Sequence, residues 1–273
     1  MSDKLKIYQD YGKKFEEFLR PLTFPIAIKF IKDESEIPPN HKKPKADLNT
    51  QIFLCQAFKM VRSYGWTIFI TEEDIVCKLA RFIYGWDALT EEAINFSNQF
   101  SVGLYAKDIN TARKWQENIY LFEEDFLGLA ISPLTRTKIE PDIVQIYCNP
   151  AQAMRIIQSY LYFKGGVLNF TSAGRGASCH EGVIKSLQTN EPQLVIPGNG
   201  DRIWGGAEDT EVMFSIPKDK LSVIIEGLET THKAGLRYPI PKYMNYNPGF
   251  QTAFKEKAKA RAGGTIIKEN KQN

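Results

Sequence analysis

The chain has 273 residues, of which 43% are hydrophobic and 25% charged, a composition typical of a globular protein and unlike that of a disordered one. Its net charge is only +3, and no aromatic residue interleaves the basic stretch that follows Lys255, so we expect no nucleic-acid partner. No run approaches the roughly 18 apolar residues of a membrane span, and residues 1–7 lack the apolar core of a signal peptide. We therefore expect a cytoplasmic protein with no membrane partner.

The first half of the chain predicts alternating helices and strands. Apolar residues at three- and four-residue steps predict a helix over 4–20, ended by Pro21. The run 25–31 predicts a strand, and the polar stretch 32–47 a long surface loop. Further along we expect a helix over 52–64 ended by Gly65, a strand over 66–70, a helix over 75–84 with a capping start at Thr71, and helical cover over 86–115.

The second half repeats one pattern, an apolar strand followed by a proline and an amphipathic helix. Strands over 143–148 and 212–216 lead into Pro150 and Pro217, and proline suits the first turn of a helix. Together with strands over 167–171 and 193–197, these units predict an α+β protein with a mixed sheet partly covered by helices. We expect a single domain over 1–250, or two fused sub-domains with a break near 116–140, followed by a basic tail over 251–273.

Three of the four cysteines stand where backbone amides are free. Cys55 begins a predicted helix, Cys77 lies near the first turn of the next one, and Cys179 lies in a glycine-rich loop that opens a third. Such positions stabilise a thiolate, the form that attacks electrophiles and binds metals. The sequence has no C-x-x-C and no zinc-spaced histidine pair, so a metal site must be assembled from distant segments. Cys148, at a strand-to-helix step, is expected to serve packing.

Two glycine-rich stretches are candidate ligand loops. The stretch 172–182 could direct its amides at an anion or at cluster sulfurs, or be a tight turn under the sheet. The stretch 197–209 fits neither the dinucleotide nor the phosphate-loop pattern, and it presents Asp201 and Arg202 as an ion pair or as ligand-orienting groups. The candidate cofactor-binding residues are Gly174, Arg175, Gly176, Gly198, Gly200, Asp201 and Arg202.

Three segments carry a resemblance to a known family: Tyr147-Cys-Asn-Pro-Ala-Gln-Ala-Met-Arg, Gly174-Arg-Gly-Ala-Ser-Cys-His-Glu-Gly and Ile196-Pro-Gly-Asn-Gly-Asp-Arg. They resemble the uncharacterised ArCR family, the domain of unknown function numbered 169. The resemblance runs from residue 25 to about Leu228 and includes Cys55 and Cys77, whereas the position of Cys148 often holds a small residue in the family. The family is common in anaerobic and methane-cycling prokaryotes, which implies that an oxygen-sensitive cofactor is tolerable. It implies no particular activity.

These observations favour a metal or iron–sulfur protein, redox or small-ligand related, in which Cys55, Cys77 and Cys179 hold a four-iron cluster. The fourth iron would be open to Cys148, a carboxylate or a substrate. One alternative is a thiol enzyme with Cys179 as nucleophile, assisted by His180. Another is a non-enzymatic module whose aromatic residues line a pocket for a small molecule or a tetrapyrrole. The expected partners are a small molecule or a redox protein, and a homodimer is the default assembly.

Overall fold

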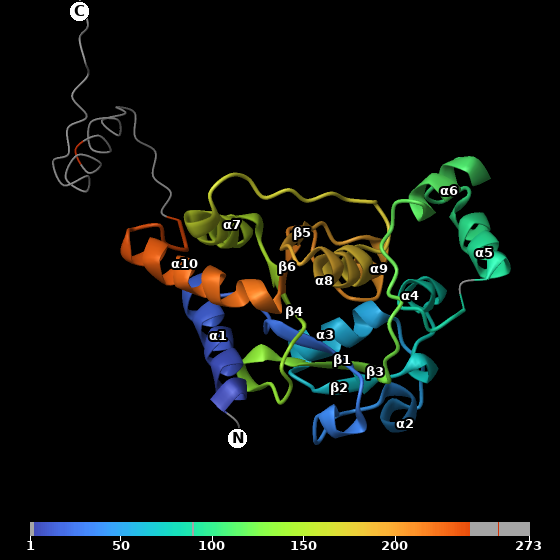
Figure 1. Ribbon diagram of the computed structural model, residues 1–273, viewed down its shortest axis with the longest axis horizontal. Helices are drawn as coiled ribbons and strands as arrows, with labels where there is room; N and C mark the ends of the chain where they lie inside the picture. The colour runs from blue at the N-terminus through green and yellow to red at the C-terminus, as the bar shows by residue number, and fades with distance from the viewer. Residues whose placement is uncertain (1–2, 89, 241–255, 257–273) are drawn as a thin grey trace, which may run out of the picture. The chain divides into compact units, whose positions relative to one another are not determined.

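The computed structural model describes residues 3–88, 90–240 and 256 (Figure 1). The chain divides into two units, Met1–Pro239 and Ile240–Asn273. The stretch 116–140 lies inside the first unit. The expected basic tail over 251–273 lies outside the described residues except for Glu256.

Six strands form one sheet in the order β2-β3-β1-β4-β6-β5. Every pairing within the sheet is antiparallel, so the sheet is not mixed, although the predicted α+β class is confirmed. Strands β2, β3 and β4 are buried at every position, as expected when helices cover both faces of a sheet. The strands are β1 (Ile26–Ile31), β2 (Ile68–Ile70), β3 (Gly128–Pro133), β4 (Ile143–Cys148), β5 (Gln193–Val195) and β6 (Val212–Pro217).

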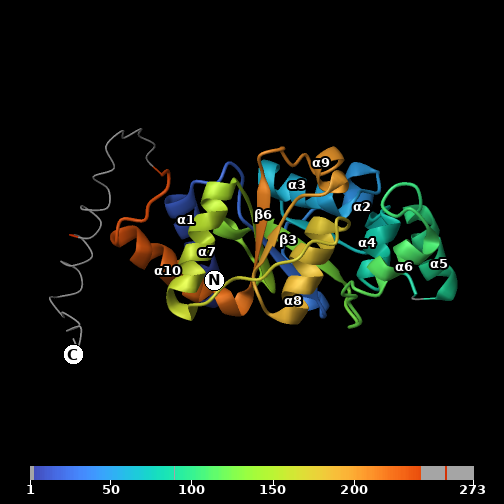
Figure 2. The same ribbon diagram turned by 90° about the horizontal axis from the view of Figure 1, so that it is seen from above.

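Two hydrophobic cores lie on opposite faces of this sheet. Because side chains alternate along a strand, Ala27 of β1 packs with α1 (Asp3–Leu19), α7 (Pro150–Lys164) and α10 (Leu221–Lys233). Its neighbour Ile28 belongs to the second core, which holds the helices around the site described below. Figure 2 shows α1, α7 and α10 grouped together at one end of the first unit.

The second core packs under three helices that begin near one another. They are α3 (Leu54–Tyr64), α4 (Lys78–Ile83) and the π-helix η4 (Ala177–Lys185), which continues as α8 (Ser186–Thr189). Next to α4 stand α5 (Glu91–Ser101) and α6 (Ile109–Gln116), which pack on each other (Figures 1 and 2). The short helices are α2 (Pro44–Leu48), α9 (Asn199–Ile203) and the 3-10 turns η1 (Glu34–Glu36), η2 (Glu72–Asp74), η3 (Leu134–Arg136) and η5 (Lys218–Lys220).

The predicted strand over 167–171 is wrong. Its apolar composition suggested a strand, but no strand of the described sheet pairs with it, and Val167 is 73% exposed. Conversely, the sequence patterns do not predict β3, although it lies between β2 and β1 inside the sheet. The strand–proline–helix units are confirmed by β4 with α7 and by β6 with α10.

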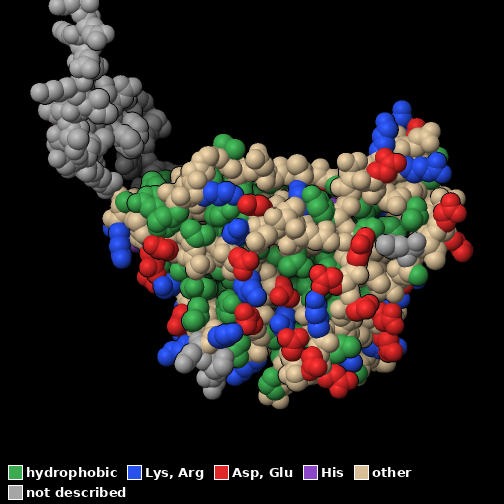
Figure 3. Space-filling model, in the orientation of Figure 1, with side chains coloured by type: hydrophobic (Ala, Val, Ile, Leu, Met, Phe, Trp, Pro, Cys, Tyr) green, Lys and Arg blue, Asp and Glu red, His purple; other side chains and the backbone are tan. Residues whose placement is uncertain are grey.

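The surface carries both signs of charge. Acidic and basic side chains are interspersed on the face shown in Figure 3, in keeping with the net charge of +3. Among the described residues, no helix combines the length and the apolar character needed to cross a membrane.

Candidate functional site

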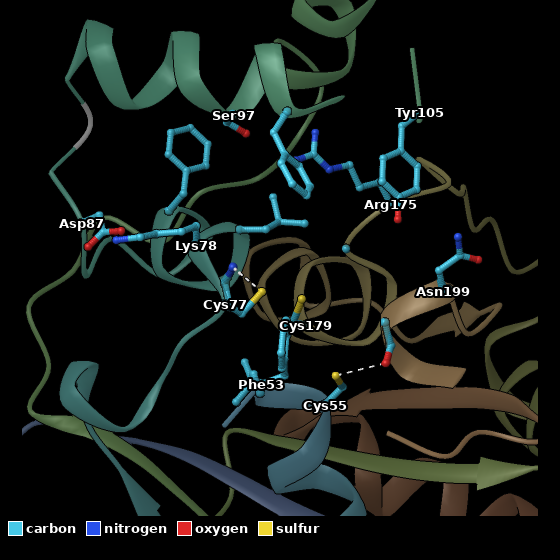
Figure 4. A pocket seen from close by; sticks show the side chains of 18 of the residues that line it. Phe53, Cys55, Cys77, Lys78, Asp87, Ser97, Tyr105, Arg175, Cys179 and Asn199 are labelled. Atoms are coloured by element: carbon cyan, nitrogen blue, oxygen red, sulfur yellow. Dashed lines mark hydrogen bonds between the residues drawn. The ribbon is translucent and has the colours of Figure 1, made fainter. Parts of the chain in front are cut away.

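A pocket of about 1240 Å³ lies over the second core, and the first turns of α3, α4 and η4 meet at its floor. Cys55, Cys77 and Cys179 all line it, although they are far apart in the sequence. Figure 4 shows the three sulfur atoms turned into the same space. The fold therefore brings together the three thiols that sequence analysis grouped.

Cys55 is the second residue of α3, a position fixed by local capping. The Gln56 side chain accepts a hydrogen bond from the Phe53 amide (2.8 Å) and so holds the first turn. The Cys55 Sγ donates to the carbonyl of Gly200 (3.3 Å), in the first turn of α9 (Asn199–Ile203). This thiol thus links the start of α3 to the second glycine-rich stretch.

Cys77 caps the N-terminus of α4. Its Sγ accepts a hydrogen bond from the Ala80 amide (3.5 Å), the role that serine or aspartate usually plays. The backbone amides of Ala80 and Leu79 favour the thiolate, but burial has the larger effect and raises the pKa of Cys77.

Cys179 lies in the first turn of the π-helix. This turn is held by one polar side chain from the sheet and one from the C-terminus of α4. Gln145 of β4 donates through Nε2 to the Ser178 carbonyl (3.0 Å), and the Tyr84 hydroxyl donates to the Cys179 carbonyl (3.0 Å). Gly176, with a positive φ of 69°, precedes the helix. π-helical turns are rare and often occur at functional sites.

Burial disfavours the ionisation of all three thiols. Burial raises the pKa of Cys179 well above its ordinary value, and negative charge on Cys77, Asp201 and Cys55 would raise it further. Burial likewise raises the pKa of Cys55, and Asp201 and Cys77 add to the effect. Without a bound metal the pocket therefore holds neutral thiols at neutral pH. A bound metal centre would reverse this preference, since its positive charge stabilises thiolates.

The two glycine-rich stretches meet at the same pocket. Of the seven candidate cofactor-binding residues, six line it. They are Gly174, Arg175, Gly176, Gly198, Gly200 and Asp201. The seventh, Arg202, lies outside the lining and pairs with Asp209 (3.0 Å).

Asp201 joins these two stretches. Its Oδ2 accepts from the amides of Gly198 (3.0 Å) and Ser178 (3.3 Å), and its Oδ1 accepts from the Ser178 hydroxyl. Burial raises the pKa of Asp201. The carboxylate thus fixes the start of α9 against the first turn of η4, which carries Cys179.

Two further candidates, His180 and Cys148, lie away from the pocket lining. The imidazole Nε2 of His180 accepts a hydrogen bond from the Tyr120 amide (2.9 Å). Burial lowers the pKa of His180 to about 4, with a smaller effect from Lys185. Cys148 is buried in the core shared by α1, α7 and α10, so it faces the opposite side of the sheet.

Within the described residues, no group of three or more histidine, cysteine, aspartate or glutamate side chains is arranged to hold a metal ion.

One wall of the pocket is not predicted from the sequence. It is formed by α5, where the periodicity indicates only helical cover. Phe96 and Phe100 of this helix line the pocket and are 56% and 58% exposed. The sequence signal for this wall is the apolar periodicity of α5. A helix that packs into a core has the same periodicity, so this signal does not distinguish a pocket wall from a core helix.

Comparison with known proteins identifies related sequences. The family described as uncharacterised ArCR, the domain of unknown function numbered 169, matches residues 14–227. An uncharacterised protein of Methanocaldococcus jannaschii is 26% identical over 204 residues, which cover 75% of this chain and 86% of that protein. No solved structure matches the chain.

Proposed function

The chain belongs to the uncharacterised ArCR family, and we propose that it is a cytoplasmic iron–sulfur protein that holds a four-iron cluster through Cys55, Cys77 and Cys179. The observation that carries this proposal is the convergence of the three thiols on one pocket, each in the first turn or at the cap of a helix. Thiolates are the ligands that iron–sulfur clusters take in proteins.

The chemistry of the donor set fits such a cluster. Three soft donors approach from three helix N-termini, whose amides and dipoles favour negative charge on sulfur and on the cluster. Among the described residues no group of three or more histidine, cysteine, aspartate or glutamate side chains is arranged to hold one metal ion, as a single zinc ion would require. A four-iron cluster takes its ligands on separate iron atoms, so three thiols around one pocket could each bind a different iron.

The surroundings suggest what the cluster would do. Cys148 lies in the other core, so the fourth iron would face the open pocket rather than a fourth cysteine. The pocket exceeds the roughly 300–1,000 Å³ usual for small-molecule sites. A cluster and a small ligand would therefore fit together, which supports a role in small-molecule chemistry over electron transfer alone. When bound, the cluster would supply electrons or a Lewis-acidic iron.

The test is the iron and sulfide content of protein purified without oxygen. We expect brown protein with iron and acid-labile sulfide in equal amounts, and we expect Cys55→Ser, Cys77→Ser and Cys179→Ser each to lose most of both. Cys148→Ser is the matched control and should keep the wild-type content. Colourless, iron-free wild-type protein, or equal iron in all four variants, would reject the proposal.

The two alternatives draw unequal support from the geometry. A nucleophilic Cys179 would need a lowered pKa and a nearby base, whereas burial raises the pKa of Cys179 and His180 is engaged with Tyr120. An aromatic pocket for a small molecule has a specific observation in its favour, the wall formed by Phe96 and Phe100. If a ligand copurifies with a variant that lacks all three pocket cysteines, the pocket is a binding module independent of any cluster.

A further inference from the structure

Arg175 is a buried cation at the pocket that has no acidic partner. The side chain is 6% exposed and lines the pocket, and no carboxylate in the described part of the chain forms an ion pair with it. Burying an unpaired charge is costly, so such a group is expected to face an anion in the working state of the protein.

The contacts of Arg175 hold it in place without using up its donors. Its guanidinium lies over the rings of Trp115 (4.5 Å) and Tyr105 (5.5 Å), and Nη1 donates to the Ser101 hydroxyl. A guanidinium has five N–H donors in a planar fork. The remaining donors are therefore left for a ligand, and the rings fix the direction in which they point.

The wall next to Arg175 is apolar. In Figure 4 the arginine extends from the glycine-rich loop toward α5, away from the three sulfur atoms. Phe96 and Phe100 of α5 line the same pocket with exposed rings. A ligand that reaches the guanidinium would thus bury its body against aromatic rings, while its other end faces the cysteines.

We infer that Arg175 anchors the carboxylate of a small organic acid whose flat, apolar body packs on α5. One guanidinium balances one negative charge in a buried site, and its fork matches a carboxylate with two parallel hydrogen bonds. A phosphate dianion would leave a second charge unbalanced near Asp201, which also lines the pocket. This inference rests on the proposed function, which makes this pocket the functional site, and it adds the class of ligand that binds there.

Paired acids and amides test the inference, because they share a shape and differ in charge. The probes are 2-naphthoate with 2-naphthamide and phenylacetate with phenylacetamide, titrated by calorimetry into the full-length protein. We expect at least one acid to bind on the order of ten- to a hundredfold more tightly than its amide, as charge-assisted hydrogen bonds imply. Arg175→Gln should abolish this preference, and Phe100→Ala should weaken acid and amide alike.

The controls separate binding from folding. Arg113→Gln removes an exposed arginine from α6 and should keep the acid preference. Arg175→Lys keeps the charge but not the fork, and a reduced preference is expected. If acids and amides bind equally to the wild type, if neither class binds, or if phenyl phosphate binds more tightly than the acids, the carboxylate assignment is overturned. These three outcomes are measured on the wild-type protein, so they hold whether or not any variant folds.

The outcome is independent of the cluster assay. Titrations are repeated on the variant in which Cys55, Cys77 and Cys179 are serine. An acid preference that depends on Arg175 in iron-free protein would support this inference even if the cluster proposal fails. Iron-loaded protein that binds acids and amides equally would reject this inference alone.

Discussion

Individual thiols in the pocket are held in their neutral form by burial. Because the pKa of each of Cys55, Cys77 and Cys179 is raised, the thiolate fraction at neutral pH is smaller than in an exposed cysteine. We predict that iron-free protein reacts with iodoacetamide at these three sites more slowly than an unfolded peptide of the same sequence at neutral pH. Mass spectrometry of each cysteine-containing peptide over time measures the rates.

The same shifts fix the direction of a pH effect. A thiol whose pKa is raised in the folded state adds stability below the unfolded pKa of about 8.5, and this contribution is lost as the pH rises further. Labelling of the pocket cysteines should therefore accelerate as the pH rises above this value, because the iron-free fold weakens. Rapid labelling of Cys179 alone at neutral pH would contradict the prediction and favour the thiol enzyme.

At the scale of the elements, one glycine sets the distance between two helices. Gly227 of α10 packs against α7 so closely that an added Cβ would lie 2.1 Å from the Ser159 carbonyl oxygen. Gly227→Ala must push the helices apart, and we expect a loss of about 1–3 kcal/mol in the free energy of unfolding. Urea denaturation measures it. Glu226→Ala changes the exposed neighbouring residue and should leave stability almost unchanged; equal unfolding midpoints for the two variants would count against this close packing.

The sequence could predict the elements that depend on neighbouring residues, but not those that depend on contacts between distant segments. The proline after β4 acts within a few residues, so α7 could be predicted. The capping signal at Thr71 predicts the start of the helix over 75–84, but it starts the 3-10 turn η2, and α4 begins only at Lys78. Strand β3 depends on partners far along the chain, since it pairs with both β2 and β1. The π-helical turn of η4 depends on contacts such as Gln145 with Ser178, which no local periodicity encodes.

In the candidate site, too, the local features could be predicted from the sequence and the long-range contacts could not. Free amides around Cys55, Cys77 and Cys179 are a local property, and they justified grouping the three residues. The aromatic wall could not be predicted, because Phe96 and Phe100 have the spacing of core residues and only the tertiary structure leaves them uncovered. The unpaired charge of Arg175 likewise becomes visible only once its neighbours are known.

For the molecule as a whole, the proposed cluster would act as a cross-link. Its ligands come from α3, the start of α4 and η4, which are distant in sequence and meet only in the folded protein. A ligand that binds only the folded state stabilises it by about 2.7 kcal/mol when present at 100 times its dissociation constant. For a domain of roughly this size that corresponds to a melting temperature about 5–11 °C higher.

We therefore predict that removing iron from the wild type by anaerobic chelation lowers its melting temperature by at least this amount. The variant in which all three pocket cysteines are serine should melt near the chelated wild type and should not respond to the chelator. Cys148→Ser is the control for loss of a thiol elsewhere, and it should keep the full response to chelation because its side chain lies in the other core. Differential scanning calorimetry of the matched samples gives the values. An unchanged melting temperature after complete iron loss would mean that the three segments hold their places without the cluster, and the metal centre would then serve chemistry but not the fold.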